Sequence, residues 1–134
     1  MPMAAQENKA IARRWFDEVI NQRRVDAVAE IYQPTYVHHG TGGRDVGREE
    51  ARAIAQRLLD ASVDRRAQVK EQIEEGNRVA TRWESVGTFA GGKRATMRGI
   101  IISRIEGDRI AEEWEVVDHI SFLDELGELP GKDA

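Results

Sequence analysis

The part of the chain that follows residue 64 alternates apolar and polar residues, and short turn signals divide it into long segments. These signals are Glu75-Gly76-Asn77, Gly91-Gly92 and Glu106-Gly107-Asp108. Glycine beside acidic or amide residues favours tight turns between antiparallel strands, and no helical pattern intervenes that could act as a crossover. We therefore expect an antiparallel meander of four strands, near residues 65–75, 78–90, 93–105 and 109–122.

The earlier part of the chain has helical periodicity instead. From Asn8 to Ile20 apolar residues recur every fourth position, and a similar stripe spans residues 49–60. A shorter helix is expected over residues 26–32, and a short strand over residues 35–39. Helices followed by a meander indicate an α+β fold of one domain (residues 1–134), in which three helices pack on a curved, mainly antiparallel sheet of four to six strands. The expected shape is a cone with a cavity at its open end.

The composition excludes several kinds of function. The formal net charge is −4 and charged residues of both signs make up 33% of the chain, so there is no basic stripe for nucleic acid. The sequence has no cysteine, which suits a reducing compartment. No apolar run approaches the ~18 residues of a membrane span, and the first residues lack the pattern of a signal peptide. We expect a cytoplasmic protein that binds neither nucleic acid nor membranes.

The strand expected over residues 109–122 carries a carboxylate among apolar residues. With a two-residue period, Asp118 shares one face with Ile110, Trp114 and Phe122. An ionised carboxylate in such surroundings costs several kcal/mol unless it is compensated, and desolvation raises its pKa, which suits a proton shuttle. We therefore expect Asp118 to be catalytic in an apolar pocket, with Trp114 as one wall of that pocket.

Other polar residues have two interpretations each. His39 shares strand parity with Val37 and either contacts a substrate carbonyl or is a half-buried structural histidine, whereas His38 is expected to point the other way. Two adjacent histidines with no carboxylate pattern nearby are weak evidence for a metal site, so we expect neither a metal nor a cofactor. Arg82 and Glu84 share a strand face and form either part of a site or a surface ion pair.

Three stretches of the sequence resemble a known family. They are Pro34-Thr35-Tyr36-Val37-His38-His39-Gly40, Val86-Gly87-Thr88-Phe89-Ala90-Gly91, and the run from Arg104 through Trp114 and Asp118 to Glu125-Leu126-Gly127. Their order resembles the pattern of SnoaL-like polyketide cyclases, which have the cone-shaped nuclear transport factor 2-like fold. The resemblance implies a cofactor-free enzyme that closes a ring by intramolecular aldol condensation. Asp118 would be its general acid/base, and its substrate a small, hydrophobic, carbonyl-bearing, polyketide-like molecule.

The resemblance also bears on the rest of the site. Ile101 stands at the position that matches a histidine of the family on the third sheet strand, and Phe89 stands in place of another family histidine. We expect Asp118 and His39 to be catalytic. The residues expected to contact substrate are Trp114, Tyr36, Trp15, Phe89, Met97 and Ile101.

Two other functions fit the same sequence. Asp118 with Arg82 and Glu84 would resemble the two carboxylates and arginine of limonene-epoxide-hydrolase-like enzymes, which activate water. The other alternative is a non-catalytic module of the same fold for small-ligand binding or dimerisation. We expect a homodimer through the outer face of the sheet. The residues expected to be exposed on that face are Trp83, Val117 and Leu123.

Overall fold

A computed structural model describes residues 7–40 and 42–128 of the chain. Within these ranges four α-helices pack against a six-stranded mixed sheet. The helices are α1 (Asn8–Arg14), α2 (Val28–Ile31), α3 (Arg48–Ala61) and α4 (His119–Leu126). The strands are β1 (Tyr32–His39), β2 (Asp45–Gly47), β3 (Arg66–Glu75), β4 (Arg78–Phe89), β5 (Lys93–Glu106) and β6 (Arg109–Val117).

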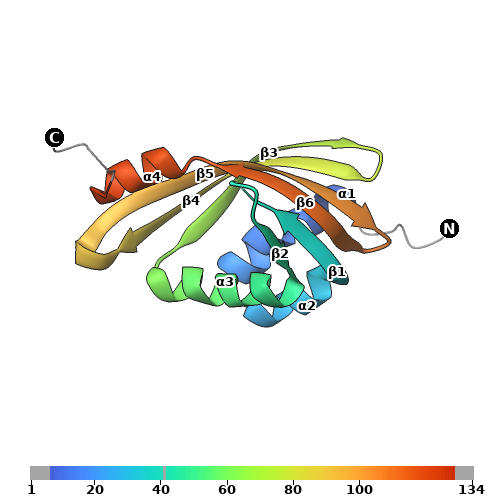
Figure 1. Cartoon of the computed structure of the whole chain (residues 1–134), viewed down its shortest axis with the longest axis horizontal. Coiled ribbons are helices and arrows are strands. Elements are labelled where there is room, and N and C mark those ends of the chain that lie inside the picture. Colours follow the sequence, from blue (N-terminus) through green and yellow to red (C-terminus); the bar gives the residue numbers. More distant parts are fainter. Residues whose placement is uncertain (1–6, 41, 129–134) are drawn as a thin grey trace.

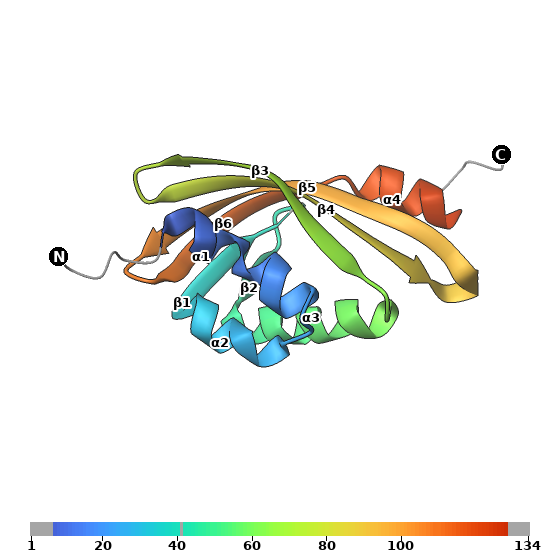
Figure 2. The same cartoon turned by 180° about the vertical axis from the view of Figure 1, so that it is seen from behind.

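The strands follow the order β2-β1-β6-β5-β4-β3 across the sheet. Strands β3 to β6 form the expected antiparallel meander, whereas β1 runs parallel to β6 and antiparallel to β2. Both views show α1, α2 and α3 on one side of the curved sheet (Figures 1 and 2). The α+β architecture predicted from the sequence is confirmed. No helix in the described ranges is long and apolar enough to cross a bilayer.

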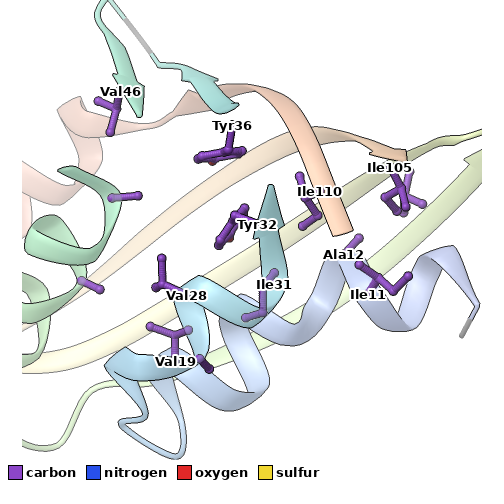
Figure 3. Packing of buried hydrophobic residues seen from close by; sticks show 14 residues of the cluster. Ile11, Ala12, Val19, Val28, Ile31, Tyr32, Tyr36, Val46, Ile105 and Ile110 are labelled. Carbon is purple, nitrogen blue, oxygen red and sulfur yellow. The ribbon is translucent and has the colours of Figure 1, made fainter. Parts of the chain in front are cut away.

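The core lies between the helices and β1. Ile11 and Ile31 are fully buried there, and the rings of Tyr32 and Tyr36 meet with their centroids 4.3 Å apart (Figure 3). Burial of an isoleucine side chain stabilises the fold by about 1.5–3 kcal/mol, so this cluster anchors β1 against the helices. The two tyrosines lie four positions apart on one strand and therefore share its inner face. The next residue on that face is His38.

α1 continues beyond Arg14 as a π-helical turn over Trp15–Ile20. The amide of Asn21 donates to the carbonyl of Phe16, five residues earlier, at 3.0 Å. A π-helical turn is wider than an α-helical one and is frequent at functional sites. In this protein it lets the adjacent side chains of Trp15 and Phe16 both line the space beneath the sheet.

The last strand is shorter than the sequence pattern predicts. β6 ends at Val117, and residues 119–126 form α4 instead of continuing the strand to residue 122. Asp118 caps this helix by accepting a hydrogen bond from the amide of Ser121 at 3.0 Å, and Gly127 ends it in the left-handed conformation. An aspartate N-cap and a glycine C-cap are strong helix boundaries. The apolar residues beyond Val117 therefore belong to a helix and not to a strand face.

A bulge changes which face of β6 looks inward. The register between β5 and β6 shifts between Arg104 and Ile105, which makes Ala111 the extra residue. Ile110 and Ala111 are consequently both buried, and beyond them the odd-numbered residues of β6 face the helices. A shift of one residue exchanges the two faces of a strand. The prediction that the even-numbered face, with Asp118, looks into the protein was therefore wrong.

Candidate active site

A cavity of about 150 Å³ lies between the inner face of the sheet and the helices α1 and α3. Most of its wall is apolar: Ala12, Trp15, Phe16, Ile20, Val46, Ala51, Ile54, Leu58, Ala67, Met97, Ile101 and Val117. The other lining residues carry polar groups: Tyr36, His38, Arg65, Trp83, Ser85, Glu113 and Glu115. Four of these come from the adjacent strands β1 and β6. We call Tyr36, His38, Glu113 and Glu115 the acidic wall.

Glu113 is buried, with 3% of its surface exposed. One carboxylate oxygen accepts from the hydroxyl of Tyr36 at 2.6 Å, and the other accepts from the hydroxyl of Ser103 at 2.5 Å. Desolvation outweighs both hydrogen bonds and raises the pKa of Glu113 to about 7. A carboxyl group with a pKa near neutrality can both accept and return a proton, which is the property required of a general acid/base.

His38 and Glu115 form a pair beside Glu113. Nε2 of His38 lies 2.8 Å from one carboxylate oxygen of Glu115, and the indole N–H of Trp83 donates to the other oxygen at 2.8 Å. Burial alone would lower the pKa of His38, but the hydrogen bond and the charge of Glu115 outweigh it, so the pKa is raised. The carboxylate thus fixes the imidazole in orientation and favours its protonated form.

The position of Trp83 depends on the glycine opposite it. Trp83 of β4 pairs with Gly99 of β5. A Cβ atom on Gly99 would lie 2.8 Å from Cζ2 of Trp83 and 2.8 Å from the carbonyl oxygen of Val116, both too close for a real contact. Glycine at this position therefore lets the indole lie across β5 and reach Glu115.

Arg65 lines a different part of the cavity from the acidic wall. It belongs to the segment between α3 and β3, and 6% of its surface is exposed. Nη1 donates to the hydroxyl of Ser85 at 3.4 Å, and among the described residues Nε has no hydrogen-bond partner. Desolvation lowers the pKa of Arg65. An arginine this deeply buried normally has a partner, so Arg65 is an unusual component of the wall.

Some residues predicted to contact substrate line this cavity and others do not. Those on its wall are Trp15, Tyr36, Met97 and Ile101. Phe89 lies behind Arg65 and packs edge-on against Phe122, with ring centroids 5.2 Å apart. Trp114 is on the outer face of the sheet, where the guanidinium of Arg78 lies 5.0 Å from its ring centroid. Neither Phe89 nor Trp114 is among the residues that line the cavity.

His39 points away from the cavity. Its two ring nitrogens lie 2.7 Å from a carboxylate oxygen of Glu112 and 2.8 Å from one of Asp45, and its ring stacks on Trp114. The hydrogen bonds with Glu112 and Asp45 raise the pKa of His39. The prediction that His39 faces the site while His38 points the other way was wrong, because His38 lies on the inner face of β1.

Asp118 is exposed and lies outside the cavity. The backbone amide of Ser121 donates to its carboxylate and lowers its pKa. The predictions that Asp118 is buried and that its pKa is raised were both wrong, because the side chain caps α4 in contact with water. We therefore do not place Asp118 in the site.

Arg82 and Glu84 lie on the outer face of the sheet. Together with Asp118 they border a shallow hollow there. Arg82 pairs with Glu71 at 3.0 Å and Glu84 with Arg98 at 3.3 Å, and these side chains are about one third or more exposed. Of the two alternatives that the sequence offered for Arg82 and Glu84, the structure therefore has the surface ion pairs. It does not support an epoxide-hydrolase site, for which the same groups should converge on one water in a closed pocket.

The sequence interpretation missed most of the polar groups of this cavity. One signal was available: because Tyr36 was expected to line the cavity, strand parity would have placed His38, not His39, on the same face. The pair Glu113 and Glu115 had no such signal, since the bulge at Ala111 leaves no mark that the pattern alone reveals. Arg65 was expected to begin the strand over residues 65–75, but it precedes β3, and nothing in the pattern marked it as part of the cavity wall.

Comparisons with known proteins agree with this architecture. The profile of the SnoaL-like polyketide cyclase family matches residues 10–126. IdmH from Streptomyces antibioticus, described as a candidate polyketide cyclase, is 24% identical, with a TM-score of 0.82 over 91% of this chain and 99% of that chain. AclR from Streptomyces galilaeus, described as a candidate hydroxylase, is 23% identical, with a TM-score of 0.83 over 95% of this chain and 89% of that chain.

A third solved structure, described as a candidate polyketide cyclase from Acidithiobacillus ferrooxidans, is 20% identical, with a TM-score of 0.79 over 96% of this chain and 99% of that chain. No curated protein matches the chain. The likeness to these structures shows the cone-shaped nuclear transport factor 2-like fold that the sequence predicted. The family profile covers most of the chain, so it assigns the chain to one family within this fold. The chain belongs to the SnoaL-like polyketide cyclase family.

Proposed function

We propose that the protein is a cyclase- or isomerase-type enzyme that moves a proton at a carbon next to a carbonyl group of a small hydrophobic substrate. The observation that carries this proposal is Glu113, a buried carboxyl group on the wall of an apolar cavity, with a pKa of about 7. Membership of the SnoaL-like family supports aldol-type ring closure as the overall reaction. Glu113 takes the acid/base role that the sequence assigned to Asp118. We expect the reaction to take place in the cytoplasm.

The contacts of Glu113 support a specific sequence of proton transfers. Ionised Glu113 removes a proton from the carbon, the electron pair of the C–H bond forms a C=C bond, and the π pair of the carbonyl moves onto its oxygen to give an enolate. The hydroxyl of Tyr36, which donates to ionised Glu113 at 2.6 Å, then becomes free to donate elsewhere. Together with His38 it can stabilise the negative charge on the enolate oxygen. In a ring closure, the enolate carbon attacks a second carbonyl, and Glu113 returns its proton to the new alkoxide.

The volume of the cavity limits the substrate. A cavity of about 150 Å³ lined by apolar side chains is known to hold a molecule as large as benzene. The cavity of this protein is that size and is partly open, so it can enclose one ring of a substrate while a second, fused ring extends toward the opening. The rings of Trp15 and Phe16 offer apolar faces on which such a molecule can pack.

The proposal is tested by hydrogen–deuterium exchange at the α-carbon of 2-tetralone, a neutral molecule of two fused rings with one carbonyl. We expect the protein to accelerate exchange in D₂O, measured by NMR, at a rate that rises with pH through about 7 as Glu113 ionises. Asp118→Asn should leave this rate unchanged, because Asp118 is exposed and outside the cavity. Binding of 2-tetralone without any acceleration would instead favour a non-catalytic ligand-binding module.

We also propose that the protein forms a homodimer through the outer face of the sheet. Ile100, Ile102 and Val116 are 52%, 40% and 69% exposed there. Ion pairs such as Arg82 with Glu71 place both signs of charge beside these residues, so the face can be complementary to itself about a twofold axis. Two of the residues that the sequence assigned to this surface do not support it: Trp83 and Val117 line the cavity instead.

The dimer is tested by light scattering coupled to size-exclusion chromatography. We expect a dimer at micromolar concentration, and a monomer for Val116→Lys, because the substitution would bury a charge in an apolar interface. Val63→Lys is the matched control, since Val63 is 85% exposed in the segment between α3 and β3. A monomeric wild-type protein would exclude this proposal.

A further inference from the structure

Arg65 is a buried cation with no counter-charge among the described residues. Only 6% of its surface is exposed, and its Nε has no hydrogen-bond partner among the described residues. Desolvation lowers the pKa of Arg65, and no acidic group opposes that effect. A buried charge without a partner costs several kcal/mol of stability. Because a fold of this size is only marginally stable, a cost of this size points to a binding role for the guanidinium.

The carboxylate next to Arg65 in sequence is already engaged elsewhere. Asp64 accepts hydrogen bonds from the amide and the hydroxyl of Thr88 at 2.7 and 2.8 Å, and from the hydroxyl of Ser62 at 2.9 Å. These bonds lower the pKa of Asp64 to about 2. Arg94 lies 3.3 Å from the same carboxylate. Asp64 is therefore fixed on the exposed side of its segment and does not neutralise Arg65.

The surroundings of Arg65 leave the cavity as the place for its anion. On one side the guanidinium carbon lies 5.4 Å from the ring centroid of Phe89. The ring of Phe89 in turn packs against the ring of Phe122. Ser85, whose hydroxyl accepts from Arg65 at 3.4 Å, also lines the cavity and is buried. Because that hydroxyl accepts from Arg65, its own hydrogen is available to a second acceptor. Arg65 and Ser85 thus offer two donors to one ligand.

We propose that Arg65 and Ser85 bind the carboxylate of the molecule that occupies the cavity, so that the natural ligand is a small ring-containing carboxylate. A single guanidinium with one hydroxyl matches the two oxygens of a carboxylate, and a charge-assisted hydrogen bond in a desolvated site is strong. The ring would pack on the apolar wall, with its reacting carbon toward the acidic wall. The inference rests on the proposed function in treating this cavity as the substrate site.

The test compares benzoate with benzamide, which have nearly the same shape and differ in charge. In calorimetric titrations we expect the wild-type protein to bind benzoate at least about tenfold more tightly than benzamide. Arg65→Met should bring this ratio to about one while benzamide still binds. Arg66→Met, at the exposed neighbouring arginine, should leave the ratio unchanged. Arg65→Lys, which keeps the charge, should retain part of the preference.

Thermal unfolding, measured both with benzoate and without ligand, provides a second readout. Benzoate should raise the Tm of the wild-type protein and of Arg66→Met, but not that of Arg65→Met. Without ligand, Arg65→Met should unfold at a higher temperature than wild type, because it removes an unpaired buried charge. A purely structural arginine would give the opposite shift.

Several outcomes would overturn the inference. They are failure of the wild-type protein to bind benzoate, equal affinity for benzoate and benzamide, and a benzoate preference that survives in Arg65→Met. None of these touches the exchange assay, because 2-tetralone is neutral. Conversely, a protein that binds benzoate through Arg65 but catalyses no exchange would refute the proposed reaction and leave the carboxylate site standing.

Discussion

Glu113→Gln is expected to slow the α-proton exchange of 2-tetralone by about 10²- to 10⁴-fold, the usual contribution of a general acid/base. Glutamine has the same shape and can still accept the hydrogen bond from Tyr36 or Ser103, so the wall should stay in place. What the variant loses is the group that takes up the proton. Its residual rate should also lose the rise through pH 7 that ionisation of Glu113 imposes. NMR exchange rates measured across pH 5 to 9 give both quantities.

The matched control is Glu112→Gln, on the same strand but on its outer face. Glu112 pairs with His39 and Arg104 on that face and is not part of the cavity wall. Its substitution should leave the exchange rate within about threefold of wild type. If Glu112→Gln slowed exchange as much as Glu113→Gln, the effect would come from general disturbance of β6. That result would contradict the proposal that Glu113 is the general acid/base.

Glu113→Gln is also expected to change how stability depends on pH. The pKa of Glu113 is about 7 in the folded protein, against an ordinary value of 4.5. Between these two values the folded state holds a proton that the unfolded state releases, so stability falls as pH rises. The stabilising contribution of the protonated group is fully present below about pH 4.5 and is lost through about pH 7. At 1.36 kcal/mol per pKa unit, the loss is about 3 kcal/mol.

The measurement is urea unfolding of both proteins at several values of pH between 4.5 and 8. The difference in unfolding free energy between wild type and Glu113→Gln isolates this group, since the other titrating residues are common to both. Wild type should lose about 3 kcal/mol relative to the variant over this interval. A difference that does not change with pH would mean that the carboxyl group is not desolvated in the folded protein, and the proton-shuttle role would lose its basis.

The sequence predicted the layout of the fold well because that layout depends on signals repeated along the chain. Turn residues such as Gly76 and Gly107 separate the strands, and a run of spaced apolar residues marks α3. Each of these elements rests on several positions, so one irregular residue does not change it. The parallel pairing of β1 with β6 was not predicted, because nothing local to either strand specifies a partner so distant in sequence.

The site was predicted poorly because it depends on single positions. One extra residue, Ala111, decides whether Glu113 or Trp114 faces the cavity. The Trp-x-x-x-Asp spacing around Trp114 suggested a strand face that continues through Asp118 to residue 122. The strand instead ends at Val117, and Asp118 is the N-cap of α4. Periodicity assumes that a strand continues without interruption, and bulges and caps are the places where it does not.

The acidic wall joins two strands that lie far apart along the chain. The hydrogen bonds from Tyr36 to Glu113 and between His38 and Glu115 each span 77 residues. Closing so long a loop has an entropic cost, so contacts of this range form late in folding, after the hairpins that lie between them. A partly folded chain that already has its helices and the β3–β4 hairpin would therefore have no proton-transfer site. The proposed exchange activity should therefore appear in a refolding experiment only when β1 pairs with β6, and the time at which it appears would report on that step.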